Sequence, residues 1–110
     1  MTTEIGKITR ADFGWGGYQD AMIGFSFTLE GKAWGVSDFK GGAWGSNRHE
    51  VSKWSEESRV TDIGEACLFV RDLLTKAKKQ SLHDLIGIPI EATFDDYIRL
   101  SSWRILEEVL

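Results

Sequence analysis

Hydrophobic and polar residues alternate along three segments in the first half of the chain. Between Ala21 and Leu29, large apolar residues are separated by small or polar ones, and this spacing of two predicts a β-strand with one buried face. Glu4–Phe13 predicts a first strand, and Ala33–Phe39 predicts a third strand that returns from a turn at 30–32. Glycines 14, 16 and 17 predict a loop that contains Trp15, and 40–47 is expected to be a second loop.

A different period marks residues 62–79. Apolar residues recur there at the i, i+3, i+4, i+7 spacing of an amphipathic helix, and Thr61 or Asp62 is a candidate N-cap. The pattern predicts one apolar stripe that packs on one face of a sheet, and the stripe includes Cys67, which we therefore expect to be buried. Its members are Ile63, Ala66, Cys67, Val70, Leu73, Leu74 and Ala77.

The end of the chain predicts a return to β-structure. Residues 81–87 are typical of a short helical turn closed by glycine, and Pro89 then begins a strand in which Ile88, Ile90, Ala92 and Phe94 share one face. Its partner is expected from Tyr97 to about Leu106. For residues 105–110 the pattern fits either strand or a final helical turn, and strand is the prediction. The predicted fold is α+β: an antiparallel sheet of about five strands (β-β-β-α-β-β) with one long helix packed on one face.

Length, charge and cysteine content narrow the class of protein. The 110 residues suffice for one domain, expected to span 1–110, and a net charge of −4 disfavours a nucleic-acid partner. No apolar run reaches the roughly 18 residues of a membrane span, and the first residues show no signal-peptide pattern. The single cysteine excludes an internal disulfide. We therefore expect a cytoplasmic protein.

Motifs for catalysis or metal binding are weak. The histidines and Cys67 do not have metal-ligand spacing, no phosphate-binding loop is present, and no serine lies in a nucleophile motif. We expect no catalytic residue, no metal and no cofactor. A small hydrolase that uses Asp20, Asp38 or His49 remains as an alternative from another class.

Aromatic residues and glycines concentrate in the first half of the chain. Two predicted loops flank the hairpin of strands 21–29 and 33–39, so they should emerge at the same end of the sheet. Large rings in glycine-rich loops, beside amides and charges, suit a protein interface or a flat nucleotide-like ligand. We expect a binding surface formed by Trp15, Tyr18, Gln19, Asp20, Asp38, Lys40, Trp44 and Arg48.

Three stretches of the sequence carry a resemblance: GGYQDAM at 16–22, WGVSDF at 34–39 and SWRILEEVL at 102–110. They resemble small accessory proteins encoded in tailed phages and prophages. The resemblance implies a phage accessory protein that acts in the bacterial host cytoplasm. By analogy with other small phage proteins, our first hypothesis is a counter-defence or host-takeover inhibitor that works by stoichiometric binding. The alternative is a protein that sequesters a nucleotide signal on the same surface. A homodimer is possible through the uncovered edge of the C-terminal hairpin.

Overall fold

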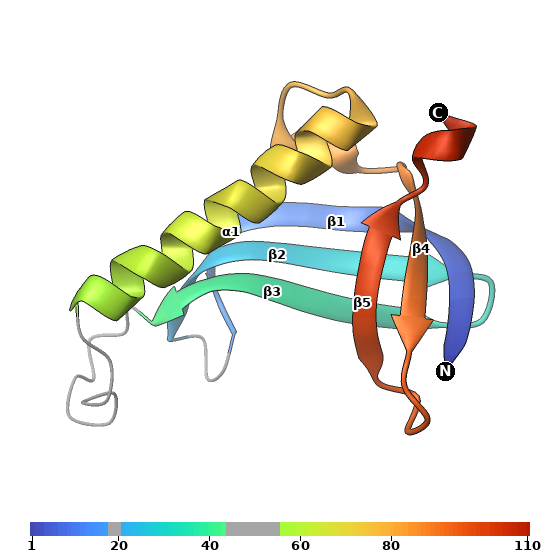
Figure 1. Ribbon diagram of the computed structural model, residues 1–110, viewed down its shortest axis with the longest axis horizontal. Helices are drawn as coiled ribbons and strands as arrows, with labels where there is room; N and C mark the ends of the chain where they lie inside the picture. Colours follow the sequence, from blue (N-terminus) through green and yellow to red (C-terminus); the bar gives the residue numbers. More distant parts are fainter. Residues whose placement is uncertain (18–20, 44–55) are drawn as a thin grey trace.

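The computed structural model describes residues 1–17, 21–43 and 56–110. Its strands form one antiparallel five-stranded sheet in the order β3-β2-β1-β4-β5, with a single long helix packed on it (Figure 1). This confirms the predicted α+β architecture. The elements are β1 (Thr2–Gly16), β2 (Met22–Gly31), β3 (Gly35–Ala43), α1 (Glu56–Ala77), the 3₁₀ turn η3 (Leu82–Leu85), β4 (Pro89–Phe94), β5 (Leu100–Ile105) and the 3₁₀ turn η4 (Glu107–Val109).

Strand β1 holds the two halves of the sheet together. Its first part pairs with β4, from Thr2 opposite Phe94 to Lys7 opposite Pro89. Its second part pairs with β2, and the register shifts at a bulge between Ile8 and Arg10. Bulges increase the local twist of a strand. In Figure 1, β4 and β5 accordingly run steeply across the direction of β2 and β3, and the sheet curves around a concave face.

Helix α1 covers part of that concave face. It packs mainly over β3, with smaller contacts to β2 and β5. Val70 and Leu73, in the middle of the predicted apolar stripe, are buried against the sheet at 7% and 5% exposure. The predicted inward face of β4 also belongs to the core. Its fully buried apolar side chains are those of Ile8, Phe27, Leu29, Leu85, Ile90 and Ile105.

Three boundaries differ from the prediction. The helix begins at Glu56, so Thr61 is not its cap; the Thr61 hydroxyl instead donates to the Glu57 carbonyl inside the helix, at 2.9 Å. Strand β1 continues through Gly16, so Trp15 lies in a strand and not in a loop. The last residues were predicted as strand and form η4, because the ladder with β4 ends where Leu106 N–H donates to the Pro89 carbonyl.

Cys67 is a further correction, because its side chain is exposed and not buried. An α-helix turns by about 100° per residue. The buried line of α1 runs through Ala66, Val70, Leu73 and Ala77, and Cys67 falls about 90°, a quarter turn, from the centre of that line. The apolar stripe predicted from the i+3/i+4 spacing covers a wider arc of the helix than the buried line, so it included Cys67 on the flank.

Candidate functional site

The end of the sheet carries the segments that were expected to converge. Gly16 at the end of β1 pairs with Met22 at the start of β2, and Met22 pairs with Ala43 at the end of β3. The chain leaves β1 and β3 at the same sheet end, as predicted for the two loops. Of the predicted site, Tyr18, Gln19, Asp20, Trp44 and Arg48 lie outside the described residues, as does His49 of the hydrolase alternative.

Trp15 lies on the concave face of β1, opposite Ile23 of β2. Side chains alternate along a strand, so Phe13 shares this face, and its ring lies 4.9 Å from that of Phe25 on β2. Because α1 packs over β3, it leaves this part of β1 uncovered. Trp15 and Phe13 are consequently 60% and 55% exposed.

Helix α1 carries further exposed apolar side chains. Asp62, Glu65 and Phe69 lie on the flank next to β3, since they line a pocket with residues 39–41. At 100° per residue, Val60 and Cys67 lie on the opposite flank. Val60 is 59% exposed, Leu68 on the outer side is 50% exposed, and Cys67 is exposed as well.

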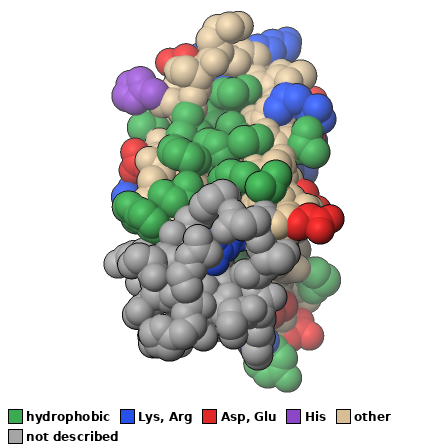
Figure 2. All heavy atoms as spheres, turned by 90° about the vertical axis from the view of Figure 1, so that its left-hand side faces the viewer, with side chains coloured by type: hydrophobic (Ala, Val, Ile, Leu, Met, Phe, Trp, Pro, Cys, Tyr) green, Lys and Arg blue, Asp and Glu red, His purple; other side chains and the backbone are tan. Residues whose placement is uncertain are grey.

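We call Phe13, Trp15, Val60, Cys67 and Leu68 the end patch. Figure 2, which views the molecule from this end, shows hydrophobic side chains gathered in one area, with acidic and basic side chains at its margins. Single exposed apolar residues are normal on a protein surface, whereas a contiguous group marks an interaction site. Of these five residues, only Trp15 was among the predicted site residues.

The sequence analysis ended the first predicted strand at Phe13, did not count Phe13 among the site residues, and did not consider Val60. One signal in the sequence points to the patch: Phe13 and Trp15 are two residues apart and therefore share one face of any strand that contains both. What the sequence did not reveal is that α1 lies over β3 and leaves that face of β1 open.

Asp38 and Lys40 lie on the concave face of β3, at the other flank of α1. The indole N–H of Trp103 on β5 donates to the Asp38 carboxylate at 2.7 Å, and Lys40 Nζ lies 3.5 Å from the same oxygen. The Lys40 ammonium also lies 5.0 Å from the centre of the Phe69 ring on α1. These two predicted site residues thus join β3 to β5 and to α1.

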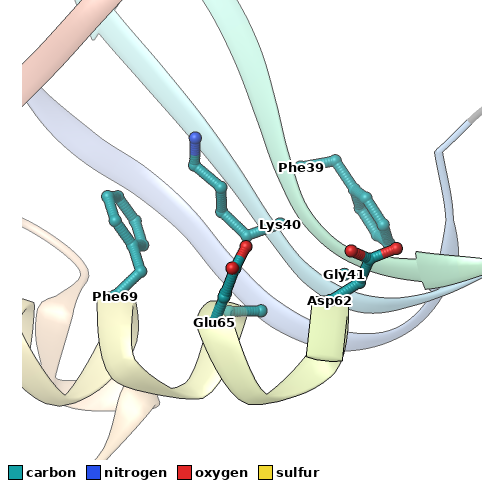
Figure 3. A pocket seen from close by; sticks show the side chains of 7 residues that line it. Phe39, Lys40, Gly41, Asp62, Glu65 and Phe69 are labelled. Carbon is teal, nitrogen blue, oxygen red and sulfur yellow. The ribbon is translucent and has the colours of Figure 1, made fainter. Parts of the chain in front are cut away.

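A small polar pocket lies beside Lys40, between β3 and α1. Its volume is about 340 Å³, and Figure 3 shows the carboxylates of Asp62 and Glu65 reaching from the helix toward the strand. Of the described residues that line it, none offers a hydroxyl, a thiol or an imidazole. No group of three or more potential metal ligands gathers within residues 1–17, 21–43 and 56–110. The charged groups of this pocket are the carboxylates of Asp62 and Glu65 and the ammonium of Lys40, which is already paired with Asp38.

Shifted pKa values occur in ion pairs away from the end patch. The pKa of Asp95 lies below its ordinary value, chiefly because the backbone N–H of Arg99 donates to its carboxylate. The pKa of Glu108 is lowered by its hydrogen bonds with Arg104, whose own pKa is raised by Glu108 and Glu91. Both networks hold the β4–β5 hairpin and the chain that follows it.

Comparison with known proteins does not assign the chain to a family. No protein-family model matches it, no curated protein is similar to it, and no solved structure matches it. No helix of the described part is long and apolar enough to cross a membrane. What the protein does has to be inferred from its own residues.

Proposed function

We propose that this protein acts by stoichiometric binding to a partner protein through the end patch. The observation that supports the proposal is the exposure of Trp15 and Phe13, 60% and 55%, side by side on one face of β1. Aromatic side chains of this size bury a large area at small entropic cost, and they dominate the energetics of protein interfaces. Rings left uncovered by the fold's own helix are suited to this role.

The surroundings of the two rings favour a protein over a small ligand. A nucleotide-like ligand requires polar groups that fix its edge and its phosphate beside the stacking ring. The predicted polar groups that the structure describes, Asp38 and Lys40, are engaged with Trp103 and Phe69. An apolar centre with charges of both signs at its margin, as in Figure 2, has the anatomy of a protein interface.

The sequence resemblance to phage accessory proteins suggests which partner to look for. In that setting the partner is a protein of the bacterial host, and binding inhibits a defence or another host process in the cytoplasm. Sequestration of a nucleotide signal is the competing proposal. A hydrolase that uses Asp38 is the third alternative. It differs from both binding proposals because it would turn over substrate at substoichiometric amounts of protein.

Native mass spectrometry of the protein purified from host cells tests the proposal. We expect a one-to-one complex with a host protein for the parent chain. Trp15→Ala should weaken that complex by about 2 kcal/mol or more, roughly thirtyfold. Tyr97→Ala is the matched control, because Tyr97 is an aromatic residue that is 79% exposed on the distant β4–β5 turn, and it should bind like the parent.

Three outcomes would contradict protein binding. A nucleotide released on heating would favour the sequestering alternative, and turnover of a substrate would favour the hydrolase. Equal binding of the partner by the parent and by Trp15→Ala, measured on folded proteins with equal melting temperatures, would remove the end patch from the interface.

A further inference from the structure

A second hollow lies at the opposite end of the concave face from the end patch. There the β2–β3 turn, the start of β1 and the β4–β5 turn come together (Figure 1). They surround a pocket of about 510 Å³ whose walls include Trp34, Val36, Phe94 and Ile98, with the carboxylates of Glu4 and Asp95 beside them. We call it the mouth pocket. It shares no residue with the end patch, so a ligand site there is independent of the proposed function.

The tryptophan of the mouth pocket is held in place by glycines. A Cβ on Gly31 would lie 2.1 Å from Trp34 Nε1, and one on Gly6 would lie 2.8 Å from its Cζ2, so the indole fits only because both positions lack a side chain. The Phe94 ring packs edge-on against the indole, with centroids 5.3 Å apart. The ring is therefore fixed, and part of its surface remains open to the pocket.

Glu4 places an exposed carboxylate on the concave face of β1. Alternation along β1 places it on the same face as Gly6 and Ile8, which are buried, and its partner across the ladder is Ala92, which is 0% exposed. No hydrogen bond or ion pair joins the Glu4 carboxylate to another of the described residues. The carboxylate is therefore free to pair with a positive group that enters the mouth pocket.

Asp95, the other carboxylate of the mouth pocket, is already engaged. The backbone N–H groups of Tyr97 and Arg99 donate to its Oδ1, each at 2.9 Å, and the Arg99 side chain lies 3.4 Å from its Oδ2. None of the described residues that line the pocket carries a positive charge. Glu4 is therefore the uncompensated charge beside the indole.

We propose that the mouth pocket binds an organic cation with an apolar body, an alkylammonium or a guanidinium. The positive group lies between the Glu4 carboxylate and the Trp34 ring, where an ion pair and a cation–π contact add. The apolar body fills the space between Val36, Phe94 and Ile98. A free arylalkyl amine, protonated at neutral pH, and a lysine or arginine side chain of another protein share this chemistry.

Titration of the full chain by NMR tests this site, with the indole N–H of Trp34 as the reporter. Its resonance is assigned by its disappearance in Trp34→Phe. Phenethylammonium should shift it and saturate at millimolar concentrations, and should bind about fivefold more tightly than phenethyl alcohol, its neutral counterpart, as expected for exposed charge contacts. Nα-acetyl-lysine amide, which keeps its side-chain ammonium, stands in for a lysine of another protein. The tighter of the two cations shows whether the ligand is a free amine or a protein side chain.

Glu4→Gln should bring phenethylammonium binding down to the level of the alcohol and leave alcohol binding unchanged. Glu57→Gln is the control, because it removes an exposed carboxylate from α1, far along the chain from the pocket, and it should keep the preference for the cation. Absence of any shift at Trp34, equal binding of amine and alcohol by the parent, or a preference that survives in Glu4→Gln would overturn the proposal.

Discussion

Trp34 and Trp15 lie at opposite ends of the same concave face, and their surroundings differ. Trp34 is partly buried, rests over Gly6 and Gly31 and packs against Phe94. Trp15 also has glycines as chain neighbours, yet it is 60% exposed. The difference arises from what covers the sheet: the β1–β4 part folds toward Trp34, whereas α1 lies over β3 and leaves Trp15 open. The exposure of an aromatic residue on a strand is thus decided by the neighbouring layer, not by its own strand.

The largest expected effect contrasts the covered and open sides of α1. Leu73, on the side of the helix that packs on the sheet, is 5% exposed, and Leu68, in the end patch, is 50% exposed. Leu73→Asp should abolish cooperative unfolding, because a buried unpaired carboxylate costs several kcal/mol out of a total stability of roughly 5–15 kcal/mol. Leu68→Asp should melt within a few degrees of the parent. Circular dichroism melting curves measure both, and an unchanged curve for Leu73→Asp would contradict the packing of α1 on the sheet.

A pair of glycine substitutions compares the surroundings of the two tryptophans directly. Gly31→Ala places a methyl group 2.1 Å from Trp34 Nε1, whereas a Cβ at Gly14, beside Trp15, meets nothing within 4 Å. We expect Gly31→Ala to lower the free energy of unfolding by about 2 kcal/mol, as for an overpacked core, and Gly14→Ala to change it by less than about 0.5 kcal/mol. Urea denaturation measures both. Equal stabilities would show that the indole of Trp34 is not fixed by its glycines.

The sequence predicted the parts of this fold that depend on local pattern. The order of strands and helix, the buried positions of Val70 and Leu73, and the inward face of β4 all follow from periodicity, and the structure confirms them. The exposure of Cys67 and the continuation of β1 past Trp15 were missed. Both depend on where α1 rests and which strands extend one another, and no short-range spacing encodes such contacts.

The candidate site shows the same limit. Asp38 was predicted to face a ligand because it lies near aromatic residues in sequence. In the structure its carboxylate accepts a hydrogen bond from Trp103, which is 65 positions away in the chain and which the sequence did not predict as its partner. Charge and residue type identified a polar group of interest, but only the pairing of distant strands decides which partner such a group meets.

The contact between Asp38 on β3 and Trp103 on β5 leads to a prediction with an intermediate effect on the free energy of unfolding. A hydrogen bond to a charged, part-buried acceptor contributes more than a neutral one, so Trp103→Phe should lower the free energy of unfolding by about 1–2 kcal/mol. Asp38→Asn should have a smaller effect, because its amide oxygen still accepts a hydrogen bond. A double-mutant cycle tests the contact itself. The double variant should lose less unfolding free energy than the sum of the losses in the two single variants. Strict additivity would mean that the 2.7 Å contact adds no stability in solution.

The smallest expected effect on stability belongs to Cys67, on the open side. Its thiol is exposed on the flank of α1 that forms the end patch, so Cys67→Ala leaves no cavity and should change the free energy of unfolding by less than about 0.5 kcal/mol. The native thiol should react with a maleimide nearly as fast as the thiol of the urea-unfolded chain. Slow labelling of the native protein would mean that another part of the chain covers this flank, and the contrast between an open Trp15 end and a closed Trp34 end would then fail. Addition of the host partner tests the patch further, since a protein bound across Trp15 and Val60 should slow labelling in proportion to the fraction of chain in the complex.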